Sequence, residues 1–215
     1  MRRYTKSVFP IAALAGFFLL LEQSAATPAA RAESFPSPPL KKREMRDQEA
    51  RRVEAIFEEL STRKANGEDP GPRHRISESE LNSYLSYLVE KENIAGVDAL
   101  FVKLRQDSFT TYGIINVDKM QKQDHDAATR LLMQTILAGK QYLSAEGSLT
   151  ARNGLGQYTL TGARINDVDI PPGIVNALIN LAGKKQDPPF DLTKPFRLPY
   201  NIREAELGPG YLEVF

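Results

Sequence analysis

The stretch LSAEGSLTARNGLGQYTLTGARI, residues 143–165, carries the clearest pattern in the chain. Apolar or small residues occupy every second position over 143–151, and polar residues occupy the positions between them. Such alternation predicts a strand with one buried face. Asn153-Gly154 follows, and this pair favours the tight turn of a β-hairpin. The stretch therefore predicts an antiparallel hairpin.

The second strand of this hairpin changes phase along its length. Tyr158 and Leu160 share one face, whereas Ile165 lies at the opposite parity. A strand keeps its faces unless an extra residue is inserted, so the change predicts a bulge or bend near Gly162-Ala163. Because a bulge bends its strand, a bulged strand beside small residues predicts a curved sheet.

Two more hairpins are expected on either side of this one. Residues 96–117 alternate as two strands, with a turn at Asp107-Ser108. Residues 202–207 and 211–215 form the last pair, joined by Gly208-Pro209-Gly210.

Four segments have helical periodicity. Residues 44–63 place Val53, Ile56, Phe57 and Leu60 on one stripe. Residues 78–91 follow a capping box. Two further helices are expected, one that begins at Asp124 or Asp126 and ends at Gly139, and one over 173–183 that is apolar around most of its circumference.

The capping box is the best-specified local signal in the chain. Ser77 and Glu80 have the Ser-x-x-Glu spacing, and Ile76 and Leu81 flank them as a hydrophobic staple. This arrangement predicts where the second helix begins.

The order of these elements predicts the fold class. Hairpins alternate with single helices, and no regular strand–helix–strand repeat occurs. We expect an α+β fold, in which a curved antiparallel sheet of hairpins wraps around amphipathic and apolar helices and a charged helix precedes the sheet.

The N-terminus has the layout of an export signal. Arg2, Arg3 and Lys6 precede an apolar run over 8–21, and a small-x-small site ends at Ala32. The run is about 14 residues, shorter than the roughly 20 needed to span a bilayer. Residues 1–32 are thus a signal peptide or, alternatively, a retained N-terminal anchor. We expect export to the periplasm or to the extracytoplasmic face of the membrane.

The remainder divides into three parts by composition. Residues 33–43 form a proline-rich linker, 44–73 a charged amphipathic helix and loop, and 74–215 the α+β domain. The whole chain carries a net charge of +1. Residues 1–32 hold four basic residues and one acidic residue, which leaves the remainder near −2. This balance argues against nucleic acid as a partner. The chain has no cysteine, which excludes disulfides.

Catalytic patterns are weak in this sequence. His125 lies between Asp124 and Asp126, but consecutive side chains on a helix diverge, and acidic residues there suit a helix N-terminus. Glu204 and Glu206 fit the solvent face of an edge hairpin. No serine elbow or metal-ligand spacing is present. We expect a non-catalytic protein without cofactor or metal, and keep a hydrolase as a third alternative.

Three stretches resemble a known group of proteins. They are residues 76–85 (ISESELNSYL), residues 147–179, and PFRLP at 195–199 followed by Ile202. They resemble small exported bacterial envelope proteins of the YpmS-like and LmeA-like type, over about residues 76–215. The resemblance implies a TULIP-like, tubular lipid-binding fold with an apolar interior. It implies no catalytic residue.

Together these observations suggest an exported envelope protein that binds or carries a lipid or another apolar ligand. The candidate lining residues are Leu85, Leu88, Ile174, Leu178 and Leu181. Ordinary core packing is the more common reason for such residues, and the sequence alone does not separate a filled core from an unfilled one. The alternative is therefore a structural or protein-interaction module of the cell envelope with a solid core, whose helix 44–63 contacts an envelope protein. Contact with the membrane surface, or an N-terminal anchor, is a further expectation.

Overall fold

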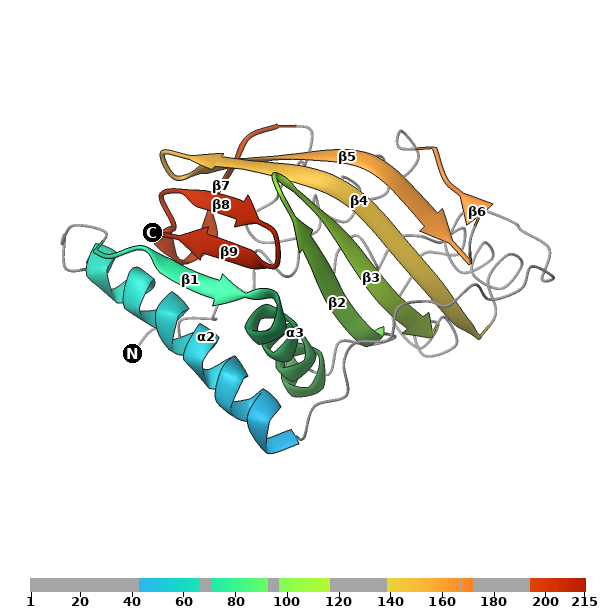
Figure 1. Ribbon diagram of the computed structural model, residues 1–215, viewed down its shortest axis with the longest axis horizontal. Helices are drawn as coiled ribbons and strands as arrows, with labels where there is room; N and C mark the ends of the chain where they lie inside the picture. Colours follow the sequence, from blue (N-terminus) through green and yellow to red (C-terminus); the bar gives the residue numbers. More distant parts are fainter. Residues whose placement is uncertain (1–42, 66–70, 93–96, 117–138, 167, 172–193) are drawn as a thin grey trace, which may run out of the picture.

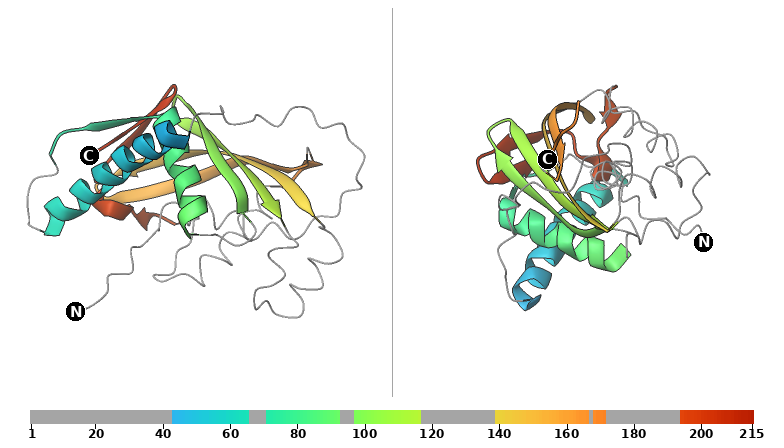
Figure 2. Two further views of the ribbon diagram at one scale, coloured as in Figure 1. Left: turned by 90° about the horizontal axis from the view of Figure 1, so that it is seen from below. Right: turned by 90° about the vertical axis from the view of Figure 1, so that its right-hand side faces the viewer.

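The computed structural model describes residues 43–65, 71–92, 97–116, 139–166, 168–171 and 194–215. Over these residues, one antiparallel sheet curls into a half-barrel and two helices pack at one side of it (Figures 1 and 2). The expected α+β class, with an antiparallel sheet built of hairpins, is confirmed.

The two helices form where the periodicity placed them. Helix α2 spans Arg43–Ala65 and helix α3 spans Glu78–Glu92, and the two pack against each other. The apolar stripe of α2 is buried, with Val53 at 0% and Leu60 at 2% exposure. One face of helix α2 therefore belongs to the core of the sheet domain, and its opposite face is exposed.

The capping box at the start of α3 is confirmed. The Ser77 backbone N–H donates to Glu80 Oε2 over 2.8 Å, and the Glu80 N–H donates to Ser77 Oγ over 3.2 Å. Each residue thus satisfies a backbone donor of the other, which fixes where the helix begins. The flanking Ile76 is fully buried, and Leu81 packs against the core.

The sheet has nine strands among the described residues. Their bounds are β1 (His74–Ser77), β2 (Val97–Arg105), β3 (Ser108–Asn116), β4 (Lys140–Arg152), β5 (Leu155–Ile165), β6 (Val168–Asp169), β7 (Phe196–Arg197), β8 (Ala205–Gly208) and β9 (Tyr211–Val214). A short 3-10 helix, η1, spans Pro199–Asn201.

The longest strand, β4, organises the sheet. One of its edges pairs with β5, and its other edge pairs first with β3 and then, at Ala151, with β8. Two arms therefore leave the same edge of β4. One arm is β3–β2, and the other is β8–β9–β1 (Figure 1).

All three expected hairpins are present. The β4–β5 turn has positive φ at Asn153 (53°) and Gly154 (75°), as the Asn-Gly pair predicted. The β2–β3 turn lies one residue earlier than expected, because Arg105 pairs with Ser108 and Asp107 takes a φ of 57°.

The expected bulge lies on β5 at Thr161. Glu146 pairs with Gly162 and Gly147 pairs with Leu160, so Thr161 has no opposite residue. The buried positions accordingly change from Leu160 to Ala163 across the bulge. A bulge increases local bending and twist, which suits the curl of the sheet.

The sequence did not predict the edge strand β1. It pairs with β9 from His74↔Val214 to Ser77↔Tyr211. Its four residues follow a glycine- and proline-rich stretch, and β-alternation over such a short run carries little signal.

Several predicted segments lie outside the described residues. They are the export signal or anchor 1–32, the linker up to residue 42, the helix expected to end at Gly139 and the helix 173–183. These remain predictions.

Candidate functional site

The inner face of the sheet, which we define as the side that carries Leu143 and Ala145, is mostly apolar, and Thr111 and Gln141 are polar residues on it. Because directly paired residues share a face, the register gives its composition row by row. The inner-facing residues of β2–β5 include Leu100, Val102, Leu104, Phe109, Thr111, Ile115, Leu143, Ala145, Leu149, Tyr158, Leu160, Ala163 and Ile165.

One row across the middle of this face consists of small side chains. Thr111 of β3, Ala145 of β4 and Ala163 of β5 pair in register, and we call them the small-residue row. All three are at most 5% exposed. Thr111 Oγ1 is buried and has no hydrogen-bond partner among the described residues. A buried hydroxyl without a partner is costly, so this position is where a bound polar atom would be stabilised.

The helices pack near one end of this face. Helix α3 packs on β2, and α2 packs on α3 and η1. Leu85 and Leu88 of α3 are 2% and 4% exposed and belong to the hydrophobic cluster. Of the five predicted lining residues, these two are therefore core residues at the α3 end. Ile174, Leu178 and Leu181 lie outside the described residues.

An aromatic cluster lies between the helices and η1. The rings of Phe57 and Tyr200 stack with centroids 4.6 Å apart, and Phe57 meets Tyr84 edge-on at 5.5 Å. The Tyr84 and Tyr200 hydroxyls are 3.4 Å apart. Burial, and then the hydrogen bond to Tyr200, raise the pKa of the Tyr84 phenol, which therefore stays protonated.

Sequence reasoning missed Tyr200, which has a positive φ of 49°. A bulky residue in this region is strained, and its surroundings must hold it there. The stack on Phe57 supplies that restraint. The only local signal was the preceding Pro199, which marks a turn without indicating where the tyrosine ring goes.

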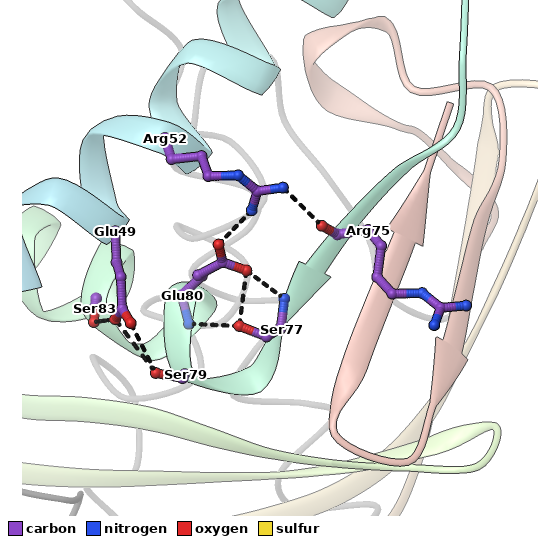
Figure 3. A network of polar contacts seen from close by, with 7 residues as sticks. All are labelled: Glu49, Arg52, Arg75, Ser77, Ser79, Glu80 and Ser83. Carbon is purple, nitrogen blue, oxygen red and sulfur yellow. Dashed lines mark hydrogen bonds and ion pairs between the residues drawn. The ribbon is translucent and has the colours of Figure 1, made fainter.

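A polar network joins α2, α3 and β1 (Figure 3). Arg52 pairs with the Glu80 carboxylate and donates to the Arg75 carbonyl oxygen over 3.3 Å. Partial burial acts to raise the pKa of Glu80, but the hydrogen bonds from Ser77 and the charge of Arg52 outweigh it. The pKa of Glu80 therefore lies below its usual value, and the carboxylate remains charged.

A second carboxylate fixes α2 against α3. Glu49 accepts hydrogen bonds from Ser83 Oγ at 2.6 Å and from Ser79 Oγ at 3.3 Å (Figure 3). Ser83 is 4% exposed, so this contact satisfies a buried hydroxyl. The two carboxylates set how the helices lie on each other.

Side chains of α3 also close the outer edge of β2. Asn82 Nδ2 donates to the Val102 carbonyl oxygen at 2.9 Å, and the Val102 N–H donates to Asn82 Oδ1 at 2.7 Å. Glu78 accepts from the Leu104 N–H at 2.8 Å. An amide side chain thus takes the place of a neighbouring strand at Val102, and this part of the edge is not open for further pairing.

The residues considered for catalysis do not assemble into a reactive site among those described. The one histidine among the described residues, His74, has its Nε2 3.8 Å from Glu59 Oε2, and Glu206 pairs with Arg73 at 3.3 Å. The described ranges hold no group of three side chains placed to bind a metal ion. His125 and its two aspartates lie outside them. Within the same ranges, no helix is long and apolar enough to cross a membrane.

No family model, no curated protein and no solved structure matches this chain.

Proposed function

We propose that this protein is a non-catalytic, exported envelope protein that binds a lipid or another apolar molecule against the inner face of its curled sheet. In this proposal the sheet and its helices form a TULIP-like fold, as the sequence resemblance implies. The proposal also includes the expected export signal, which would direct the protein to the periplasm or to the extracytoplasmic face of the membrane.

The small-residue row carries this proposal. Thr111, Ala145 and Ala163 leave the least side-chain volume of any complete row between β3 and β5. The unpartnered Thr111 hydroxyl lies among them. A mostly apolar lining with a few polar groups to orient the ligand is the usual composition of a site for a lipid-like molecule.

Filling the row tests the proposal. Ala145→Phe and Ala163→Phe each add a ring where the ligand would lie, so we expect the purified protein to lose its co-purified lipid. Ser144→Phe is the control, because Ser144 is next to Ala145 in sequence but lies on the opposite face. The measurement is organic extraction followed by mass spectrometry, with circular dichroism to confirm folding.

The proposal fails if a folded Ala145→Phe or Ala163→Phe variant retains as much lipid as the unaltered protein. It fails equally if the unaltered protein carries no lipid and takes none up from vesicles.

One observation favours the alternative of an interaction module with a solid core. Leu143, Ala145 and Ala163 are at most 5% exposed. Burial of this extent is what a filled interior also produces. In that case function would lie on exterior surfaces, such as the solvent face of α2, where Arg51 and Ala55 are exposed.

Since α2 contributes to the core, removing it would unfold the domain, and point variants test this alternative better. Arg51→Glu combined with Ala55→Arg should abolish cross-links to an envelope protein if α2 is the contact. Gln157→Arg on β5 is the control. Unchanged cross-links would exclude α2 as the contact.

A further inference from the structure

Six arginines among the described residues form ion pairs with carboxylates. The pairs are Arg46–Glu90, Arg52–Glu80, Arg63–Glu59, Arg73–Glu206, Arg75–Glu213 and Arg164–Asp169. Arg105 donates a hydrogen bond to Thr110 Oγ1 over 2.6 Å. Four others, Arg51, Arg152, Arg197 and Arg203, make neither an ion pair nor a hydrogen bond through their guanidinium groups within the described residues. Three of these four come together at one place in the fold, although 51 positions separate the first from the last.

That place is the turn between β4 and β5. Arg152 pairs with Leu155 across the hairpin, and Leu155 pairs in turn with Arg197 of β7. Directly paired residues share a face, so the leucine lies between two arginines in one row. The third arginine is adjacent, because the Gly154 N–H donates to the Arg203 carbonyl oxygen at 2.8 Å. We call the four side chains of Arg152, Leu155, Arg197 and Arg203 the turn patch.

The turn patch has an unusual composition for a solvated hairpin end. Leu155 is 48% exposed, the largest fraction among the large hydrophobic residues described. The three arginines are exposed as well. Glu204 is the acidic neighbour in the chain, so the local charge is positive. Figure 1 shows this turn at the upper left, at the opposite end of β4 and β5 from β6.

We infer that the turn patch docks this protein onto an anionic membrane surface. The arginines would contact lipid phosphates, and Leu155 would enter the boundary between head groups and acyl chains. Guanidinium groups suit this because they bind phosphate oxygens in a bidentate manner. A protein partner fits less well, since one leucine at the tip of a turn is far smaller than the area that a stable protein interface buries.

The chain has no tryptophan, so a single one can report on this turn alone. In the full-length protein with Leu155→Trp, vesicles containing an anionic phospholipid should shift the emission to the blue, and lipids brominated on their acyl chains should quench it. Vesicles of phosphatidylcholine alone should do neither. Ala55→Trp on the exposed side of α2 is the control and should stay unshifted, whatever else binds the protein to the vesicle.

The arginines are tested in the same background. Arg197→Gln should weaken the vesicle titration about fivefold, because one basic residue near an anionic surface contributes about 1 kcal/mol. Arg51→Gln removes an equally unpaired charge from α2 and should change nothing. High salt should abolish the difference between the variants.

Three results would overturn the inference. One is that the emission of the Leu155→Trp variant stays unshifted on anionic vesicles. Another is an equal response to neutral vesicles that salt leaves unchanged. The third is a shift with polyglutamate but not with vesicles, which would assign the patch to an acidic protein. The test is independent of whether the inner face binds lipid.

Discussion

The Thr111 hydroxyl is the most informative single group in this protein. It is buried on an apolar face, and the described residues offer it no hydrogen-bond partner. Thr110, the preceding residue, is buried to the same degree on the other face, but it accepts a 2.6 Å hydrogen bond from Arg105. Two adjacent threonines of equal burial thus differ in whether the hydroxyl is satisfied.

We expect Thr111→Val and Thr110→Val to change stability in opposite directions. In lipid-free protein, Thr111→Val should raise the free energy of unfolding by about 1 kcal/mol, because it removes an unsatisfied buried polar group. Thr110→Val should lower it by about 1 kcal/mol, because it removes a satisfied one. Urea titration measures both. Destabilisation by Thr111→Val equal to that by Thr110→Val would mean that the hydroxyl has a partner.

The lowered pKa of Glu80 makes the stability of the fold depend on pH. Its pKa in the folded protein is lower than the ordinary value of 4.5. The charged carboxylate therefore stabilises the fold fully above that value, and this contribution is lost as the pH falls through the lowered folded pKa. We expect Glu80→Gln to lower the melting temperature at pH 7 but to match the unaltered protein at about pH 2. A difference that persisted at the lower pH would show that the charge is not responsible.

At the scale of elements, α3 acts as the neighbouring strand that β2 lacks. Asn82 makes both hydrogen bonds that a paired strand residue would make to Val102. Helix propensity does not favour asparagine, so its position in α3 reflects this contact with the sheet.

We expect Asn82→Leu to lower the free energy of unfolding by about 2 kcal/mol, because it leaves the Val102 N–H and carbonyl without partners. It should also promote dimers or larger assemblies at high concentration, since it uncovers a strand edge. Gln48→Ala, at an exposed position of α2, is the control and should change stability by less than about 0.5 kcal/mol. Light scattering with urea titration checks both effects. A strictly monomeric Asn82→Leu variant would contradict the role given to the edge.

The effect of the bulge in β5 can be tested by comparing two single-residue deletions in that strand. Deleting Thr161 removes the unpaired residue and leaves Leu160 and Ala163 on the inner face. Deleting Thr159 instead, with both ends of the strand kept in register, turns Leu160 away from that face and places Thr161 on it. We expect the Thr159 deletion to be the more destabilising by about 2 kcal/mol, the transfer cost of one large side chain. If chemical denaturation gave the same loss in free energy of unfolding for both deletions, the bulge would have a structural role besides setting which side chains face inward.

At the scale of the whole molecule, the sequence predicted what depends on neighbours in the chain. The Asn153-Gly154 turn, the Ser77–Glu80 box and the α2 stripe are short-range patterns, and each formed where it was predicted. The division of the sheet into two arms on one edge of β4 was not predicted. It depends on pairs such as Ala151↔Ala205 and His74↔Val214, which are 54 and 140 residues apart and leave no local pattern.

The candidate site was predictable to a smaller extent. Leu85 and Leu88 were expected to line a ligand cavity. Both are buried, but burial does not distinguish a ligand-lining leucine from a core leucine. The small-residue row could not be found from sequence, because it requires the registers of three strands. The alternation of β4 alone placed Ala145 on the inner face.

Whether the inner face holds an apolar molecule can be measured by mass spectrometry of the protein purified from its own cells. Under native conditions we predict an added mass of lipid size, which disappears on denaturation. The denatured mass also gives the N-terminus, and we predict a chain that starts at Glu33. A native mass equal to that of the bare chain, unchanged after incubation with vesicles, would show that the inner face holds no lipid. The protein would then be an interaction module with a solid core.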